Sequence, residues 1–437
     1  MILVLKEIIK KKRFIHKLYI FLKLFISNLK SFIFRNYFYY LHKKKIKQLK
    51  SKEIIEVAFL ISRISQWKCQ SLYLQFKDND RFQVTIYIVP DNDDVNNSEF
   101  YNELSMTYKI LKKNGLNVVN GFNKNEDLNK VQNRIYKSDI IFFTRITKWD
   151  SKFGLQNFKN SLTCYVPYSI HVDKNDYLQL GQLFHQCLWS HYLPIKHFVE
   201  LAKKIYPAKN CKLIGYPGFD PFIDQRCLII DKSIKTWSNK KKKIIWAPHH
   251  SIEEGSHWPF FSTFLIYSKK MVNLLEKSYE ELEICFKPHP GLKEKLYQHA
   301  NWGKDKTEQY YNYWKNAKNG ILHESIYHDN FLNADAMLLD SVSFITEFAF
   351  IEKPICFLTR NDKGDYRNFM NNAGLIVFDS IQKASSWEEA ENFIDQIQNY
   401  ENSVYNLKQK ESFIKLGINK NQKSSDKVIA NIISSIS

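Results

Sequence analysis

The chain has 437 residues, more than a single hydrophobic core usually holds, so we expect two domains of roughly 150 to 200 residues each. A hydrophobic fraction of 44% is enough to bury both cores. Seven scattered cysteines, an odd number without a CxxC pair, argue against a disulfide framework and a zinc ribbon and indicate a reducing compartment.

The net charge of +19 is concentrated at the N-terminus. Residues 1–50 carry 14 Lys/Arg and one acid, Glu7, whereas the rest of the chain has a net charge of only +6. Lysines outnumber arginines 55 to 9, which does not favour the bidentate base and phosphate contacts that arginine makes. We therefore expect no nucleic-acid partner.

Residues 8–50 combine this positive charge with bulky apolar side chains. Lys17, Lys23, Lys30 and Arg35 interrupt the apolar run, so it reads neither as a membrane-spanning helix nor as a secretory signal. The pattern is typical of one or two amphipathic helices at an anionic membrane surface, where each basic residue contributes about 1 kcal/mol. The alternative is a helical extension packed on the body of the protein or on a partner.

From residue 52 onward, apolar runs of strand length alternate with helical segments. Expected strands occupy residues 53–62, 81–90, 116–121, 139–145, 163–170, 211–215, 243–248, 282–287, 319–324, 334–340, 353–359 and 374–380. Expected helices occupy residues 66–76, 98–114, 126–138 and 262–279, a segment from about Val342, and a last pair before the C-terminus. Ser98 is a plausible N-cap of the second helix and Gly115 its stop.

Strands that are nearly all apolar and alternate with helices predict parallel sheets covered on both faces, an α/β class. We expect two doubly wound, Rossmann-like domains that face a cleft. The expected boundaries are a basic helical extension at 1–50, an N-terminal domain at 51–230, and a C-terminal domain with its last helices at 231–437. The lysine run at 240–243 is interpreted as part of a solvated linker.

Ligands of open parallel sheets bind beyond the carboxyl ends of the strands. Four expected strands end in polar residues: His249 and His250, His289, Asp340 and Ser341, and the segment 168–171. His289 is also held between two prolines, which fix the backbone and place its imidazole on a stiff, non-helical segment.

The segment 334–354 suggests an anion site. Asp340 or Ser341 is expected to cap a helix beginning near Val342, whose free N–H groups would face a ligand. Glu347 is then placed to hold a ribose hydroxyl, or is an ordinary acid favoured by the helix dipole.

Four segments in this order resemble the bacterial CDP-glycerol glycerophosphotransferase family of teichoic-acid and capsule polymerases. They are GYPGFD (215–220), WAPHHS (246–251), KPHP (287–290) and ADAMLLDSVSFITEFAFIEKP (334–354). The resemblance implies a GT-B fold, a CDP-activated donor of glycerol phosphate or another polyol phosphate, and a lipid-linked or capsular polysaccharide acceptor. It also implies a peripheral location on the cytoplasmic face of the membrane.

The resemblance assigns a role to each candidate residue. His289 is catalytic, and the donor is bound by a set of residues from the C-terminal half: His249, His250, Lys287, Asp340, Ser341, Ser343 and Glu347. Where the family has a histidine and a glycine in the first domain, this chain has Tyr168 and Ser169. His171 is therefore the candidate base and Tyr168 a positioning group.

No DxD pair or His/carboxylate spacing calls for a metal ion, so we expect no metal and no cofactor besides the activated donor. Two alternatives stay open. One is a GT-B glycosyltransferase that uses a nucleotide sugar, and the other is a non-catalytic protein that binds membranes or polyanions through residues 1–50.

Overall fold

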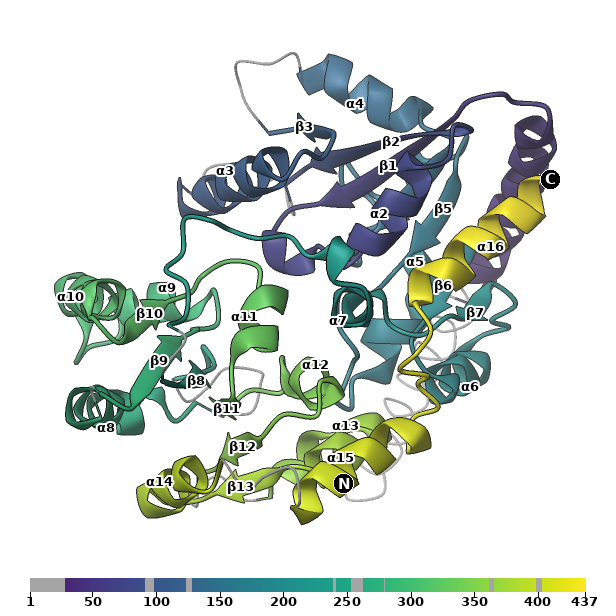
Figure 1. Cartoon of the computed structure of the whole chain (residues 1–437). Helices are drawn as coiled ribbons and strands as arrows, with labels where there is room; N and C mark the ends of the chain where they lie inside the picture. The colour runs from purple at the N-terminus through teal and green to yellow at the C-terminus, as the bar shows by residue number, and fades with distance from the viewer. Residues whose placement is uncertain are drawn as a thin grey trace, which may run out of the picture.

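The computed structural model describes residues 28–90, 98–122, 128–238, 241–252, 262–278, 280–360, 365–397 and 403–437. Two sheets, each built of parallel strands, form the centres of two domains (Figure 1). The first sheet has seven strands in the order β3-β2-β1-β4-β5-β6-β7, and the second has six in the order β10-β9-β8-β11-β12-β13. Two Rossmann-like domains are therefore confirmed.

The strands are short and bounded as follows. In the first sheet they are β1 (Ile55–Ile61), β2 (Phe82–Ile88), β3 (Val118–Asn120), β4 (Ile140–Phe143), β5 (Leu162–Tyr165), β6 (Ser190–Leu193) and β7 (Cys211–Leu213). In the second they are β8 (Lys242–Ala247), β9 (Leu282–Phe286), β10 (Gly320–Leu322), β11 (Ala336–Leu339), β12 (Ile355–Leu358) and β13 (Gln382–Ala384).

Helices follow most strands and pack on the sheets. Those of the first half are α2 (Gln70–Lys77), α3 (Ser98–Lys113), α4 (Leu128–Lys137), α5 (Leu183–Gln186), α6 (Lys196–Ile205) and α7 (Asp220–Ile223). Those of the second are α8 (Phe264–Lys277), α9 (Leu292–Gln298), α10 (Gly303–Asn316), α11 (His328–Asn333), α12 (Ile345–Phe350), α13 (Asn372–Phe378), α14 (Trp387–Asp395), α15 (Val404–Lys415) and α16 (Ser424–Ile436).

Aromatic side chains fill the layers between sheets and helices. In the first domain Phe59 of β1 stacks on Phe142 of β4, with ring centroids 4.7 Å apart. In the second, Trp246 of β8 is fully buried and packs against Phe264 of α8 and Phe286 of β9. Strands that are buried on both faces explain why their sequences read as continuous apolar runs.

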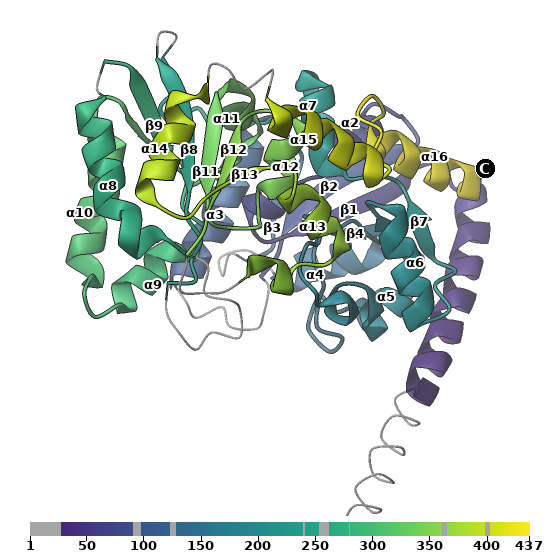
Figure 2. The same ribbon diagram turned by 90° about the horizontal axis from the view of Figure 1, so that it is seen from below.

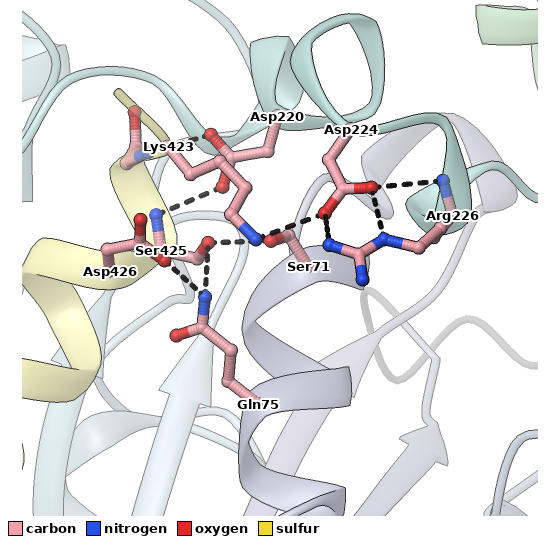
Figure 3. Close-up of polar contacts among 9 residues, drawn as sticks. Ser71, Gln75, Asp220, Asp224, Arg226, Lys423, Ser425 and Asp426 are labelled. Atoms are coloured by element: carbon pink, nitrogen blue, oxygen red, sulfur yellow. Dashed lines mark hydrogen bonds and ion pairs between the residues drawn. The ribbon is translucent and has the colours of Figure 1, made fainter. Parts of the chain in front are cut away.

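The last helix, α16, returns from the second domain to the first (Figure 1). Its Val428, Ile432 and Ile436 are fully buried in the core that surrounds β1 and α2. Figure 3 shows the polar contacts at its start, where the buried Asp220 carboxylate accepts hydrogen bonds from the N–H groups of Ser424 and Ser425, at 2.7 and 3.0 Å. Asp220 therefore caps α16 from outside the helix.

Residues 28–50 form a helix that lies against the first domain and projects beyond it (Figure 2). One face is docked: Phe38 is buried beside Trp149, and Lys45 forms an ion pair of 2.8 Å with Asp139. Within the described residues no helix is long and apolar enough to cross a membrane. The expected helical extension is confirmed for residues 28–50, and the part before residue 28 lies outside the described residues.

Three expectations for secondary structure are wrong. Residues 374–380, expected as a strand, belong mainly to α13, because Asn371 caps the segment by accepting the Gly374 N–H at 2.9 Å. The chain ends in three helices rather than a pair, and β6 was not expected. The edge strand next to β12 is β13, which follows α13 in the chain.

Candidate functional site

The KPHP segment continues β9 along its neighbour β8. The N–H groups of Lys287 and His289 donate to the carbonyls of Trp246 and Pro248, at 2.8 and 3.0 Å. The two prolines occupy the alternate positions, whose N–H groups would point toward β10, a strand that has already ended at Leu322. The last ladder bond on that side runs from the His323 N–H to the Phe286 carbonyl at 2.9 Å, so Pro288 stands where pairing with β10 ends, and it stiffens the segment that carries His289.

Because β8 and β9 are neighbours, their carboxyl ends bring three histidines together. The ring centroid of His250 lies 4.1 Å from the ring centroids of both His249 and His289, and the centroids of His249 and His289 are 5.0 Å apart. One ring nitrogen from each lies within 4.8 Å of the others. The three residues, called the histidine cluster below, were each predicted from sequence as site residues.

Nδ1 of His249 lies 3.3 Å from the Ser251 N–H and 2.8 Å from the Ser251 Oγ, so it can accept from the first or donate to the second. The tautomer of His289 is fixed, because its Nδ1 accepts the Gly291 N–H at 3.1 Å. In a neutral imidazole the other nitrogen, Nε2, must then carry the hydrogen and act as a donor. A metal ion at Nε2 requires a lone pair there, so this arrangement suits an anion better than a cation.

The cluster is neutral at physiological pH. Burial lowers the pKa of His249 to about 3, with a contribution from His250, and it lowers the pKa of His289 well below its usual value. The neighbouring His249, His250 and Arg63 lower the pKa of His289 further. Burial and the charge of Lys295 lower the pKa of His250, whose buried Nδ1 has no hydrogen-bond partner. The surroundings are thus electropositive without any charge on the imidazoles.

Asp340 hydrogen-bonds to the backbone of the histidine cluster. Its carboxylate accepts the His249 N–H at 2.6 Å and both the N–H and the hydroxyl of Thr263 at the start of α8, at 2.6 and 2.8 Å. The side chain is fully buried, and burial raises its pKa to about 6 against the effect of these hydrogen bonds. Asp340 therefore positions the backbone of His249.

The helix expected from Val342 begins later, so its expected cap is corrected. α12 starts at Ile345, with Phe344 as its N-cap and no side-chain cap. Asp340 is engaged elsewhere, and Ser341 closes a tight turn in which its Oγ accepts the Ser343 N–H at 3.0 Å. The two serine hydroxyls also bond to each other at 2.9 Å. The turn holds these hydroxyls together just beyond the end of β11.

Glu347 lies in a buried network that joins the two domains. Its Oε1 accepts the hydroxyls of Tyr216 and Tyr327, at 3.1 and 3.2 Å, and its Oε2 accepts that of Thr346 at 2.8 Å. Lys68, from the loop between β1 and α2, donates to the Tyr327 hydroxyl at 2.7 Å. In this conformation the Glu347 carboxylate is used for hydrogen bonds within the domain interface. Burial lowers the pKa of Lys68 to about 7, although the negative charge of Glu347 acts in the opposite direction.

Lys287 is also held by the protein. Its Nζ contacts Nδ1 of His323 at 3.2 Å and donates to the Ser325 carbonyl at 2.9 Å. The side chain is buried, which lowers its pKa to about 8. Burial and the charge of Lys287 lower the pKa of the neighbouring His323, and the Lys287 side chain does not reach the surface.

His171 lies where the two domains touch. Its ring is nearly buried, with Nδ1 3.5 Å from Asp173 and Nε2 3.4 Å from Asp176. Burial opposes ionisation of Asp173, but its hydrogen bond and charge contact with His171 hold its pKa below the usual value. The Asn371 side chain of the second domain donates to the His171 carbonyl at 3.1 Å. Because Nδ1 faces Asp173, the nitrogen that could accept a proton is Nε2, which lies 3.4 Å from Asp176 and has no hydrogen-bond partner among the described residues.

Tyr168 precedes this segment and is 43% exposed. Its carbonyl accepts the Tyr216 hydroxyl at 2.6 Å, which connects it to Glu347 through Tyr216. Tyr168, His171 and Glu347 therefore lie where the first domain meets the second. Sequence reasoning missed Arg63 and Lys68, since single basic residues after a strand carry no motif.

Comparisons with known proteins bear on the fold. No protein-family model matches the chain, and no curated protein matches it. Among solved structures, the wall teichoic acid polymerase TagF is 13% identical, with a TM-score of 0.55 over 94% of this chain and 98% of that one. MnaA of S. aureus with UDP is 14% identical, with a TM-score of 0.52 over 87% and 96% of the two chains.

UDP-GlcNAc 2-epimerase from Neisseria meningitidis, bound to UDP-GlcNAc, is 11% identical, with a TM-score of 0.50 over 87% of this chain and 100% of that one. At such identities the likeness shows the fold alone. The two-domain GT-B architecture is thereby confirmed, and its neighbours are enzymes that use nucleotide-linked compounds.

Proposed function

We propose that this protein is a transferase that moves glycerol phosphate, or another polyol phosphate, from a CDP-activated donor to a polysaccharide or lipid-linked acceptor. The observation that carries the proposal is the histidine cluster, where the neutral imidazole of His289 is held as an Nε2–H donor beside His249 and His250 and within reach of the charge of Arg63. Fixed N–H donors in a partly buried site suit the phosphates of such a donor.

The fold comparison adds support. TagF is similar to this chain over nearly its whole length and has been solved after soaking with CDPG. The resemblance assigns donor binding to the KPHP segment and to the serine-containing turn after β11, and both follow the carboxyl ends of strands of the second sheet. Ser341 and Ser343 offer hydroxyls beside the cluster's supporting residue Asp340.

In the proposed reaction an acceptor hydroxyl oxygen attacks the distal phosphorus of the donor. A bond forms between that oxygen and phosphorus, and the bond from phosphorus to the bridging oxygen breaks, so CMP leaves with the electron pair. His289 stabilises the charge that grows on CMP by hydrogen bonding, as a preorganised donor does. The proton of the acceptor hydroxyl passes to Nε2 of His171, where that hydroxyl takes the place of Asp176, while Asp173 stays at Nδ1 and orients the ring. Tyr168 positions the acceptor.

A second candidate is transfer of a sugar from a nucleotide sugar. It is favoured by the likeness to MnaA with UDP and to the epimerase bound to UDP-GlcNAc. The two candidates differ in the donor and in the electrophile, which is phosphorus in the first and an anomeric carbon in the second. Incubating the full chain with CDP-glycerol or UDP-GlcNAc and a membrane fraction, and measuring release of CMP or UDP, separates them.

We further propose that the protein binds anionic membranes through the exposed face of the helix at 28–50. That face carries Leu29, Phe32, Ile33, Tyr37 and Tyr40 together with Lys30, Lys43, Lys44 and Lys47, all exposed. Its opposite face is docked on the protein, so the apolar residues remain available to lipid. An apolar strip among lysines is complementary to a headgroup layer of negative charge.

Co-sedimentation tests this surface. The double variant Phe32→Ser/Ile33→Ser is expected to lose at least tenfold in affinity for phosphatidylserine vesicles, because each lost apolar side chain removes roughly 1.5 to 3 kcal/mol of burial. A matched control replaces the exposed Leu407 and Ile414 of α15 by serine. Equal binding by both double variants would contradict the proposed membrane contact.

A further inference from the structure

Arg63 lies immediately beyond the carboxyl end of β1, the strand between β2 and β4 near the middle of the first sheet. Nothing in the sequence pattern marks this residue. The N–H groups of Arg63 and Ser62 donate to Oε1 of Gln66, at 3.3 and 3.2 Å, so the Gln66 side chain closes the turn that carries Arg63. The loop is thus shaped before any ligand arrives.

Two contacts from α3 orient the Arg63 side chain. Its Nε lies 2.8 Å from a carboxylate oxygen of Glu103, and its guanidinium lies 5.7 Å from the centre of the Phe100 ring. The side chain of Arg63 is nevertheless 42% exposed. Because a guanidinium has five N–H donors in a planar fork, the ion pair at Nε leaves the Nη groups able to bind an anion.

The loop that carries Arg63 is fixed against the second domain. Lys68, five residues on, donates to the Tyr327 hydroxyl at 2.7 Å and lies over the same ring at 4.2 Å. The Nζ of Lys287 in the KPHP segment also lies over this ring, 5.7 Å from its centre, so Tyr327 joins the loop after β1 to the segment that carries His289. The charge of Arg63 reaches the histidine cluster, since it is among the causes that lower the pKa of His289.

We propose that Arg63 is a phosphate-binding residue of the donor site, contributed by the N-terminal domain opposite His289. This inference rests on the proposed function and deepens it. A nucleoside diphosphate held between the guanidinium and the histidine cluster would contact both domains at once. Arginine matches the geometry of phosphate oxygens through two parallel N–H groups, which a lysine cannot do.

The proposal predicts that Arg63 reads the phosphates and not the base. Calorimetry on the full chain would compare CDP with cytidine for wild type, Arg63→Gln, Arg63→Lys and Lys77→Gln. Lys77 ends α2 and is exposed, so Lys77→Gln makes the same change in net charge on another part of the domain. Melting temperatures of all four proteins show whether each variant is folded.

We expect Arg63→Gln to weaken CDP binding roughly tenfold or more, as loss of a charge-assisted contact does, while cytidine binding changes by less than about twofold. Arg63→Lys should fall between wild type and Arg63→Gln, and Lys77→Gln should match wild type. Equal CDP affinity in Arg63→Gln and wild type would overturn the inference while leaving the proposed function intact. A wild-type chain that binds neither CDP nor UDP would overturn both.

Discussion

Replacing Asp220 by alanine removes the external cap of α16. The carboxylate accepts two backbone N–H groups, and a hydrogen bond to a charged group contributes about 1.5 to 3 kcal/mol, or roughly 3 to 6 kcal/mol for the pair. Burial of the carboxylate opposes this gain, since it raises the pKa of Asp220 to about 6 even with these hydrogen bonds in place, so the net contribution is smaller than their sum. We expect a net loss of about 2 kcal/mol, which lies within the range of N-cap deletions.

The assay is urea unfolding at pH 7, followed by circular dichroism. Asp426→Ala is the matched control, because Asp426 is in the first turn of the same helix and bonds only at the surface, to Gln75 at 2.6 Å. An exposed pair of that kind contributes less than about 1 kcal/mol. The reasoning is refuted if Asp220→Ala lowers the free energy of unfolding by no more than Asp426→Ala does.

Three further predictions concern charge. Burial lowers the pKa values of His191 and His328 to about 3. The unfolded chain therefore binds more protons than the folded chain between pH 3 and 6.5. The free energy of unfolding should fall as the pH falls, by at most roughly 3 kcal/mol per histidine at about pH 4. A free energy of unfolding that stays constant from about pH 7 to 4 would contradict this. Burial likewise lowers the pKa of Lys68 to about 7, so stability should rise from pH 7 to 10, and a Lys68→Met variant with an unchanged slope would argue against that cause. Turnover should survive a chelator, since His289 is held as an N–H donor and so offers no lone pair to a metal ion at Nε2. Activity lost in chelator and restored by magnesium would show a metal requirement.

Much of the architecture follows from the sequence because buried parallel strands are apolar throughout. β6 escaped notice because Ser190 and His191 are polar yet fully buried, and the His191 ring stacks on that of His185 at a distance of 4.9 Å. α13 reads as a strand because its apolar run is short. The side-chain cap and the close approach of Gly374 to Val172 decide its conformation, and neither is visible in the local pattern.

The candidate site divides in the same way. The histidine cluster follows from two strands that end in histidine, but their adjacency depends on sheet order. Lys287 belongs to the same motif as His289, yet it bonds to His323 and Ser325, which follow β10. The sequence does not predict that β10 is the neighbour of β9. Arg63 and Glu347 depend on how the two domains meet, which no local pattern specifies.

The central claim is that the histidine cluster holds the phosphates of a cytidine-linked donor. Calorimetric titration of the purified chain with CDP, UDP, GDP and ADP tests it most directly, alongside His289→Ala and His289→Gln, which keeps an N–H donor. We expect selective binding of CDP, lost in His289→Ala and partly retained in His289→Gln. Preference for UDP would favour the sugar transferase, and absence of nucleotide binding, or equal affinity in wild type and His289→Ala, would contradict the claim.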